Sequence, residues 1–315
     1  LNATAPRALL AAPPQITSHL PTTGFVRLVT WDYLSRLLGK PYRRESPRIP
    51  WEKAPRDSRP SLAAALARRA FLSPPTAARF GFFGSFDRDW LGLQPRGVHH
   101  LSLWFQRSEE TPELLRLLRV GGVTHTVGLH DEGLEELEPV AIEVSDFAGP
   151  VYLKRVPGAR PRVYAVDGAR VADGLRALQL LVDPGFDPGQ EIVKESGEAT
   201  VHDPAFASEC RLVQEQSDRL LIEARLDAPG YVVALDAFDP GWIARLDGHE
   251  VALLRANVGF RAVAVPAGRH EVEMLYRPRG LWPGLAASGV AFLLVLGSLV
   301  PGRRPRPPGH AEAAS

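Results

Sequence analysis

The chain has only one cysteine, Cys210, among its 315 residues. An internal disulfide is therefore excluded, and the fold has to be stabilised by burial of apolar side chains. An excess of charge of either sign is missing too, because 37 Lys and Arg balance 36 Asp and Glu, for a formal net charge of +1. Without a basic excess there is no electrostatic argument for binding nucleic acid.

Several patterns that mark catalytic and metal sites are also missing. No serine lies in a nucleophile-elbow pattern, and the glycine-rich segment GFFGSF lacks the spacing of a phosphate-binding loop. His99 and His100 are adjacent and would point to opposite faces of a strand, while HDE at 130–132 has no further ligand at metal-site spacing. We therefore predict no metal site, no cofactor and no catalytic residue within this chain.

An export signal is the next missing feature. The chain opens at Leu1 without a basic, apolar and small-residue leader, and the apolar stretch after Arg7 is too short to serve as one. We therefore expect an export signal to lie upstream, and the chain to be a C-terminal fragment or a processed product.

A long uncharged segment, Leu281 to Val300, is the most distinctive feature that is present. At about 1.5 Å per residue it matches the roughly 30 Å hydrocarbon core of a bilayer, which predicts a transmembrane helix over 281–300. Trp282 would lie at one interface, and the arginine-rich segment 301–315 would be a cytoplasmic tail, with the rest of the chain outside the cytoplasm. A buried helix of a soluble domain and a processed sorting tail stay open as alternatives.

The rest of the chain divides by pattern. Residues 1–60 are proline-rich and without periodicity, which indicates an irregular segment. Residues 61–207 mix helix and strand patterns and predict an α+β extracytoplasmic unit. One helix is expected to be capped by Thr111, with Pro112 in its first turn and Gly121-Gly122 at its end, and another is expected from Gly168 to Leu181.

From residue 208 to 278 the pattern is entirely that of strands separated by Gly, Asp and Pro turns, which predicts a small β-sandwich. Asp247-Gly248 predicts a type I′ hairpin turn. The predicted fold class is α+β: an irregular or helical N-terminal region, a small α+β middle unit, an antiparallel β-sandwich and one C-terminal transmembrane helix.

The motif order in the last part of the chain carries a resemblance. GYVVALDAFDPGW, then LDGHEV, then LLRANVGFRAVAVPAGRHEVEMLYRPRG before the apolar segment resembles the C-terminal region of YfhO-like bacterial polytopic membrane proteins. Upstream segments such as LLRLLRVGGVTHTV and VYLKRVPGARPRVYAV fit the same family, so the resemblance covers roughly residues 80–300. Those proteins are similar to C-type glycosyltransferases that use lipid-linked sugars.

The resemblance implies that the full-length protein transfers a sugar from a polyprenyl-phosphate carrier to a cell-envelope glycan at the bacterial cell membrane. The catalytic acid of such enzymes lies near the first membrane spans, which this chain does not contain, so the chain alone is expected to be inactive. Its expected role is that of an extracytoplasmic accessory domain. The alternative is a non-enzymatic, membrane-anchored β-sandwich module that binds glycan or a protein partner.

The segment DAFDPGW places the carboxylates of Asp236 and Asp239 next to the indole of Trp242 in the sequence. Carboxylates suit the hydroxyls of a sugar, and an indole suits the apolar face of a pyranose ring. A competing interpretation makes the tryptophan of DAFDPGW a core residue and the second aspartate a turn former. Asn257 and Arg261 have a structural interpretation as well, in which they form hydrogen bonds across a turn. The candidate glycan-binding residues are Asp236, Asp239, Trp242, Asn257 and Arg261.

Overall fold

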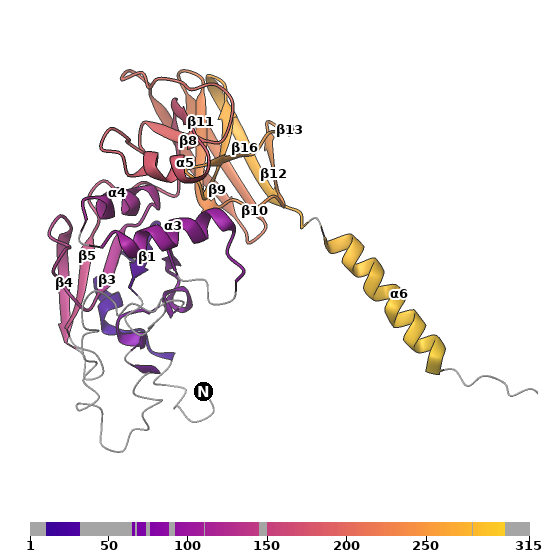
Figure 1. Ribbon diagram of the computed structural model, residues 1–315, viewed down its shortest axis with the longest axis horizontal. Helices are drawn as coiled ribbons and strands as arrows, with labels where there is room; N and C mark the ends of the chain where they lie inside the picture. Colours follow the sequence, from indigo (N-terminus) through magenta and orange to yellow (C-terminus); the bar gives the residue numbers. More distant parts are fainter. Residues whose placement is uncertain are drawn as a thin grey trace, which may run out of the picture.

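The computed structural model describes residues 11–31, 65–66, 68–73, 76–87, 92–109, 111–144, 150–278 and 280–299. Its fold is α+β, with three mostly antiparallel sheets and few helices (Figure 1). The predicted fold class is confirmed at this level. Most of the segment 1–60 and all of the tail 301–315 lie outside the described residues.

The first sheet has the strand order β2-β1-β3-β5-β4. The central strand β1 pairs in parallel with β2 and β3, whereas β5 pairs antiparallel with β3 and β4. All four residues of β1 are buried, so part of the segment predicted to be irregular is a core strand. Short 3-10 helices, η1 (Gln15–His19) and η3 (Thr76–Phe80), accompany the sheet. The strands are β1 (Arg27–Thr30), β2 (Phe83–Gly84), β3 (His125–Gly128), β4 (Glu138–Val144) and β5 (Pro150–Arg155).

Two helices connect the strands of this sheet. The predicted helix is α4 (Glu113–Val120), and it ends at Gly121 as expected, but the hydroxyl of Thr111 donates to the carbonyl of Ser108 (2.7 Å) instead of capping the helix. Helix α3 (Arg96–Arg107) was not predicted. Its apolar residues recur at helical spacing and bury one face against the sheet, so His99 and His100 lie on a helix and not on a strand.

The other two sheets pack face to face as a sandwich. One has the order β13-β12-β16-β10-β9, and the other has the order β6-β11-β15-β14-β8-β7. Alternate residues such as Ile222, Val232, Val263 and Val272 fill the space between the sheets. The strands are β6 (Val163–Val166), β7 (Gly168–Val171), β8 (Glu191–Lys194), β9 (Ser208–Glu215), β10 (Arg219–Leu226), β11 (Gly230–Ala237), β12 (Trp242–Leu246), β13 (His249–Val251), β14 (Leu254–Ala256), β15 (Phe260–Val265) and β16 (Gly268–Tyr276).

The structure differs from the predicted sandwich in some details and agrees with it in the hairpin turn. Strands β6 to β8 precede residue 208 but belong to the six-stranded sheet, and the helix expected from Gly168 is replaced by strand β7 followed by α5 (Gly174–Leu181). The segment EVALLRA, residues 250–256, contributes to β13 in one sheet and forms β14 in the other. The hairpin turn is confirmed, with φ of 51° at Asp247 and 84° at Gly248.

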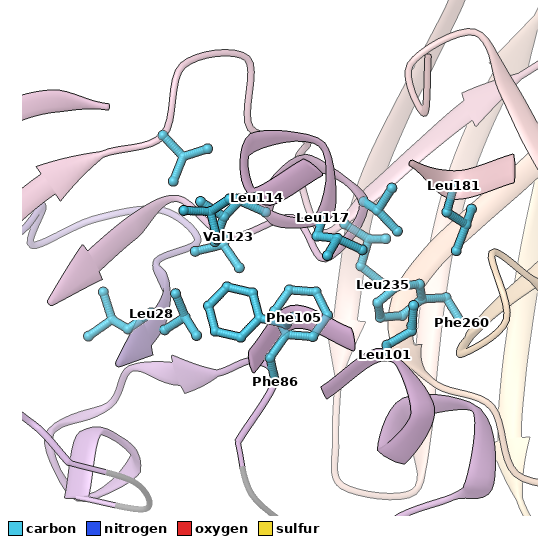
Figure 2. Close-up of a cluster of buried hydrophobic side chains, with 14 of the residues drawn as sticks. Leu28, Phe86, Leu101, Phe105, Leu114, Leu117, Val123, Leu181, Leu235 and Phe260 are labelled. Carbon is cyan, nitrogen blue, oxygen red and sulfur yellow. The ribbon is translucent and has the colours of Figure 1, made fainter. Parts of the chain in front are cut away.

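One hydrophobic core joins the first sheet to the sandwich. It runs from Leu28 of β1 through Phe105 of α3 to Leu235 and Phe260 of the sandwich (Figure 2). Helix α3 lies so close to the β14–β15 turn that a Cβ atom on Gly97 would overlap the carbonyl oxygen of the turn. This packing fixes the two parts against each other and brings β1 close to the end of β11.

The last helix, α6 (Leu281–Leu299), extends away from the sandwich (Figure 1). It carries no charged residue, and its apolar side chains are exposed, with 77% of Trp282 and 69% of Leu294 accessible. In the part of the chain that the structure describes, no helix meets the length and hydropathy required for crossing a membrane. The transmembrane helix predicted over 281–300 is therefore not confirmed.

Candidate ligand-binding site

A pocket of about 550 Å³ opens where the end of the sandwich meets β2 of the first sheet. Its walls come from β2, the segment before β6, the β9–β10 turn, the end of β11, the start of β12 and β15. The pocket thus gathers side chains from distant parts of the sequence. Its charged and aromatic lining residues are Phe83, Arg162, Glu215, Asp236, Trp242 and Arg261.

A β-bulge near the end of β11 places the central carboxylate. The pairing of β11 with β15 shifts register between Ala234 and Ala237, so two residues on β11 have no direct partner there. Leu235 turns into the hydrophobic core and donates its backbone N–H to the carbonyl of Arg162 (2.9 Å). The next residue, Asp236, lines the pocket.

Three arginines surround the Asp236 carboxylate. Its Oδ2 atom lies 3.2 Å from Nη2 of Arg162 and 3.3 Å from Nη2 of Arg261, and its Oδ1 atom lies 3.6 Å from Nη2 of Arg27. Arg162 also pairs with Glu215 at the pocket rim, and Arg27 donates to the carbonyl of Gly121 (2.9 Å). These three cations and two carboxylates leave one net positive charge.

Aromatic rings hold the guanidinium groups. The Cζ atom of Arg261 lies 3.8 Å from the ring centroid of Trp242, and that of Arg162 lies 4.8 Å from the centroid of Phe83. Such stacking covers a guanidinium face and leaves its in-plane N–H groups available for hydrogen bonds. Tyr276 packs beside Trp242 at 5.2 Å between centroids. The indole expected to contact a pyranose is therefore covered on one side by Arg261.

Burial governs the titration of these arginines. Desolvation lowers the pKa of Arg27 and of Arg261 to about 10, although Asp236 opposes the decrease. Burial also acts to lower the pKa of Arg162, but Asp236 and Glu215 outweigh it and the pKa is raised. All three guanidinium groups therefore stay protonated at neutral pH, and the site is cationic.

The structure brings together three of the five predicted residues, namely Asp236, Trp242 and Arg261. Asp239 lies in the turn before β12, where its carboxylate accepts the backbone N–H of Gly241 (2.7 Å). Asn257 is fully buried with φ of 48°, and its amide oxygen accepts the N–H of Val193 (2.8 Å). Neither Asp239 nor Asn257 is among the residues lining this pocket.

The partners of Asp236 that come from far away in the chain were not predicted from the sequence. Phe83, Arg162 and Glu215 line the pocket, and Arg27 reaches Asp236 from β1. One signal was visible for Arg27, because it interrupts the apolar run FVRLVTW and its strand is buried throughout. A cation inside such a run needs a buried counter-charge.

The other side chains that were considered for metal binding or nucleophilic chemistry lie outside this pocket. The described ranges contain no cluster of three or more His, Cys, Asp or Glu side chains that could hold a metal ion. His130 pairs with Glu109 (2.8 Å), and Asp131 pairs with Lys154. Burial raises the pKa of the free thiol of Cys210 to about 11, so the thiol is protonated at neutral pH.

Fold and pocket together define the class: an α+β protein whose C-terminal β-sandwich carries a cationic pocket and leads directly into an uncharged helix. Residues 237–288 match the family described as bacterial membrane protein YfhO. The chain therefore ends in a YfhO-like C-terminal region, and the resemblance inferred from the motifs is confirmed for this segment. Searches of the curated proteins and of the solved structures found no match.

Proposed function

We propose that this chain is the extracytoplasmic C-terminal region of a bacterial membrane protein and serves as an accessory domain of a glycosyltransferase that uses a lipid-linked sugar. In this role the pocket around Asp236 binds part of the lipid-linked donor or of the envelope glycan that accepts the sugar. The match to a membrane protein family supports the membrane setting. The proposal concerns binding and positioning, with the chemistry supplied by another part of the full-length protein.

The observation that carries this proposal is the position of the pocket beside the start of α6. Trp242 of the pocket packs on Tyr276, the last residue of β16, and the N–H of Arg277 donates to the carbonyl of Gly241 (2.7 Å). Helix α6 begins shortly afterwards, at Leu281. A ligand in this pocket would therefore lie close to any surface into which α6 inserts.

We further propose that α6 is the membrane attachment of this region. Its exposed apolar side chains favour a hydrocarbon environment, at about 25 cal/mol for each Å² removed from water. Trp282 would suit the interface at one end, and Arg303, Arg304 and Arg306 follow the other end, which favours a cytoplasmic tail.

Membrane topology can be tested by cysteine labelling of the full-length protein in intact cells. In a Cys210→Ser background, a membrane-impermeant maleimide should label Glu223→Cys on the exposed face of the sandwich before cell lysis. Ser315→Cys in the tail should react only after permeabilisation. Labelling of both sites in intact cells would show that α6 lies on the membrane surface, and labelling of neither would place the sandwich in the cytoplasm.

The accessory role can be tested by deleting residues 209–278 from the full-length protein while membrane insertion is preserved. We expect sugar transfer to the envelope to fall, and Trp242→Ala to reduce it in the same direction. Unchanged transfer in both variants would restrict the sandwich to a structural role.

The alternative is a non-enzymatic module that binds a protein partner. One observation favours it: β4 is an edge strand of the first sheet, and its Val140, Ile142 and Val144 side chains are exposed. Such an edge offers unpaired backbone groups and apolar contacts to another strand. Loss of a co-purifying partner after Ile142→Lys, with sugar transfer intact, would favour this alternative.

A further inference from the structure

We infer that the pocket around Asp236 recognises an oxyanion, a phosphate or a carboxylate carried by its ligand, and that Arg261 and Arg162 are the residues that contact it. The inference deepens the proposed function and rests on it, because it specifies the charge of the group that the pocket takes. It follows from the balance of charge, from an unused buried donor and from the covered aromatic faces.

The positive charges around Asp236 outnumber the negative ones. Asp236 is the shared counter-ion of Arg27, Arg162 and Arg261, at nitrogen to oxygen distances of 3.2 to 3.6 Å. Charge-assisted pairs of full strength have distances of about 2.7 to 2.9 Å. The Asp236 carboxylate therefore neutralises the three guanidinium groups only in part. The second carboxylate, on Glu215, is 44% exposed at the rim. An additional anion would complete the pairing.

One buried hydrogen-bond donor of the pocket residue Arg261 has no acceptor in the part of the chain that the structure describes. Arg261 is only 2% exposed, and its Nη1 atom has no hydrogen-bond partner among the described residues. A buried charged N–H group without a partner carries a desolvation penalty that an incoming oxyanion would relieve. Because Arg261 lines the pocket, a bound ligand could supply that oxygen. Arg27 contributes charge from behind Asp236, since it does not line the pocket.

The aromatic rings of the pocket stack on guanidinium groups. A neutral sugar is usually held by stacking an apolar face of its ring on an exposed aromatic side chain. Here guanidinium groups already lie over Trp242 and Phe83. The rings thus fix the orientation of the arginines, and the pocket presents the N–H edges of planar cations, a geometry that matches phosphate and carboxylate oxygens.

Two sources of such an oxyanion are compatible with the position beside α6: a phosphorylated saccharide or the headgroup of a lipid. The probe that separates them is glucose 1-phosphate, titrated calorimetrically into the full chain in phosphatidylcholine nanodiscs. We expect binding that weakens as salt is added, and no measurable binding of methyl glucoside. Methyl glucoside binding as tightly as glucose 1-phosphate would overturn the inference.

Nanodiscs that contain phosphatidylglycerol distinguish the sources. If a lipid headgroup occupies the pocket, the anionic lipid will compete and reduce the apparent affinity for glucose 1-phosphate, whereas an unchanged affinity identifies a saccharide ligand. Either result supports an oxyanion site. Absence of glucose 1-phosphate binding in phosphatidylcholine nanodiscs would contradict it.

Matched variants link the binding to the pocket. Arg261→Gln should weaken glucose 1-phosphate binding by about tenfold or more, the usual effect of losing a charge-assisted hydrogen bond. Arg255→Gln is the control, because Arg255 also stacks on a ring, that of Phe238 (4.7 Å), and pairs with Glu195 (2.7 Å), but lies outside the pocket. Equal loss in both variants would refute the assignment.

A gain of affinity guards against misfolding as the explanation. Glu215→Gln removes a negative charge from the rim and should tighten glucose 1-phosphate binding severalfold, a result that an unfolded variant cannot give. Unchanged or weaker binding in this variant would count against the inference. Failure here is distinct from failure of the proposed function, since sugar transfer can depend on residues 209–278 whether or not the ligand is anionic.

Discussion

The clearest test of the charge cluster is Asp236→Asn, which keeps the shape of the side chain and removes its charge. Arg27, Arg162 and Arg261 would then lose their shared counter-ion. Removing one partner of a fully buried ion pair costs about 3 to 5 kcal/mol, and removing one at the surface costs less than about 1 kcal/mol. The side chain of Asp236 is 18% exposed and that of Arg261 is 3% exposed, so the site is closer to the buried limit. We expect a loss of about 3 kcal/mol in the free energy of unfolding.

The assay is urea denaturation of the full chain in detergent micelles, followed by circular dichroism. The matched control is Glu223→Gln, which removes the carboxylate from an exposed pair with Arg211 and should cost less than about 0.5 kcal/mol. If Asp236→Asn is no more destabilising than this control, the carboxylate does not hold the arginines together and the account of the site is wrong.

Three further predictions concern other parts of the chain. Burial raises the pKa of Asp87 from 3.8 to about 7, so the native state binds more protons than the unfolded state between about pH 4 and pH 7, and stability should fall as pH rises through that window. Asp87→Asn should remove this dependence and be more stable than the parent by about 4 kcal/mol at pH 8 in urea denaturation, and a parent of equal stability at pH 5 and pH 8 would contradict the prediction. Gly97→Ala should cost about 2 kcal/mol in the same assay, because its Cβ would overlap the Val258 carbonyl oxygen, whereas Gly284→Ala, with no atom near its Cβ, should change little. Alkylation of Cys210 by iodoacetamide should be slow at pH 7 and should rise about tenfold for each pH unit up to about pH 11, and rapid labelling at pH 7 would show that the thiol is not buried as described.

Local signals in the sequence were sufficient where neighbouring residues determine the structure. Pro112 and Gly121 marked α4, and the Asp247-Gly248 pair marked its hairpin, because each depends on backbone angles that few residues adopt. Helix α3 was missed although its buried face has helical spacing, since the adjacent histidines were interpreted as part of a strand. The division of EVALLRA between two sheets depends on tertiary pairing, which no local pattern specifies.

In the candidate site, too, only the residues that are close in the sequence were predicted. Asp236, Trp242 and Arg261 lie within one short stretch of sequence, and they were recognised as chemically interesting side chains. Arg27 and Arg162 reach the Asp236 carboxylate only because the first sheet and the sandwich pack against each other around a shared core. From the sequence, the indole of Trp242 was expected to be free to contact a sugar. In the structure the guanidinium of Arg261 stacks on it, a contact that depends on the tertiary fold.

The short connection between β16 and α6 has a mechanical consequence. Four residues, 277–280, separate Tyr276 from Leu281, so the Cα atoms of these two residues are at most about 18 Å apart. If α6 is embedded in a bilayer, the pocket stays close to the lipid surface and meets its ligand by lateral diffusion in the membrane plane. The quantity that sets its occupancy is then the density of ligand in the membrane plane, and a weak intrinsic affinity suffices where that density is high.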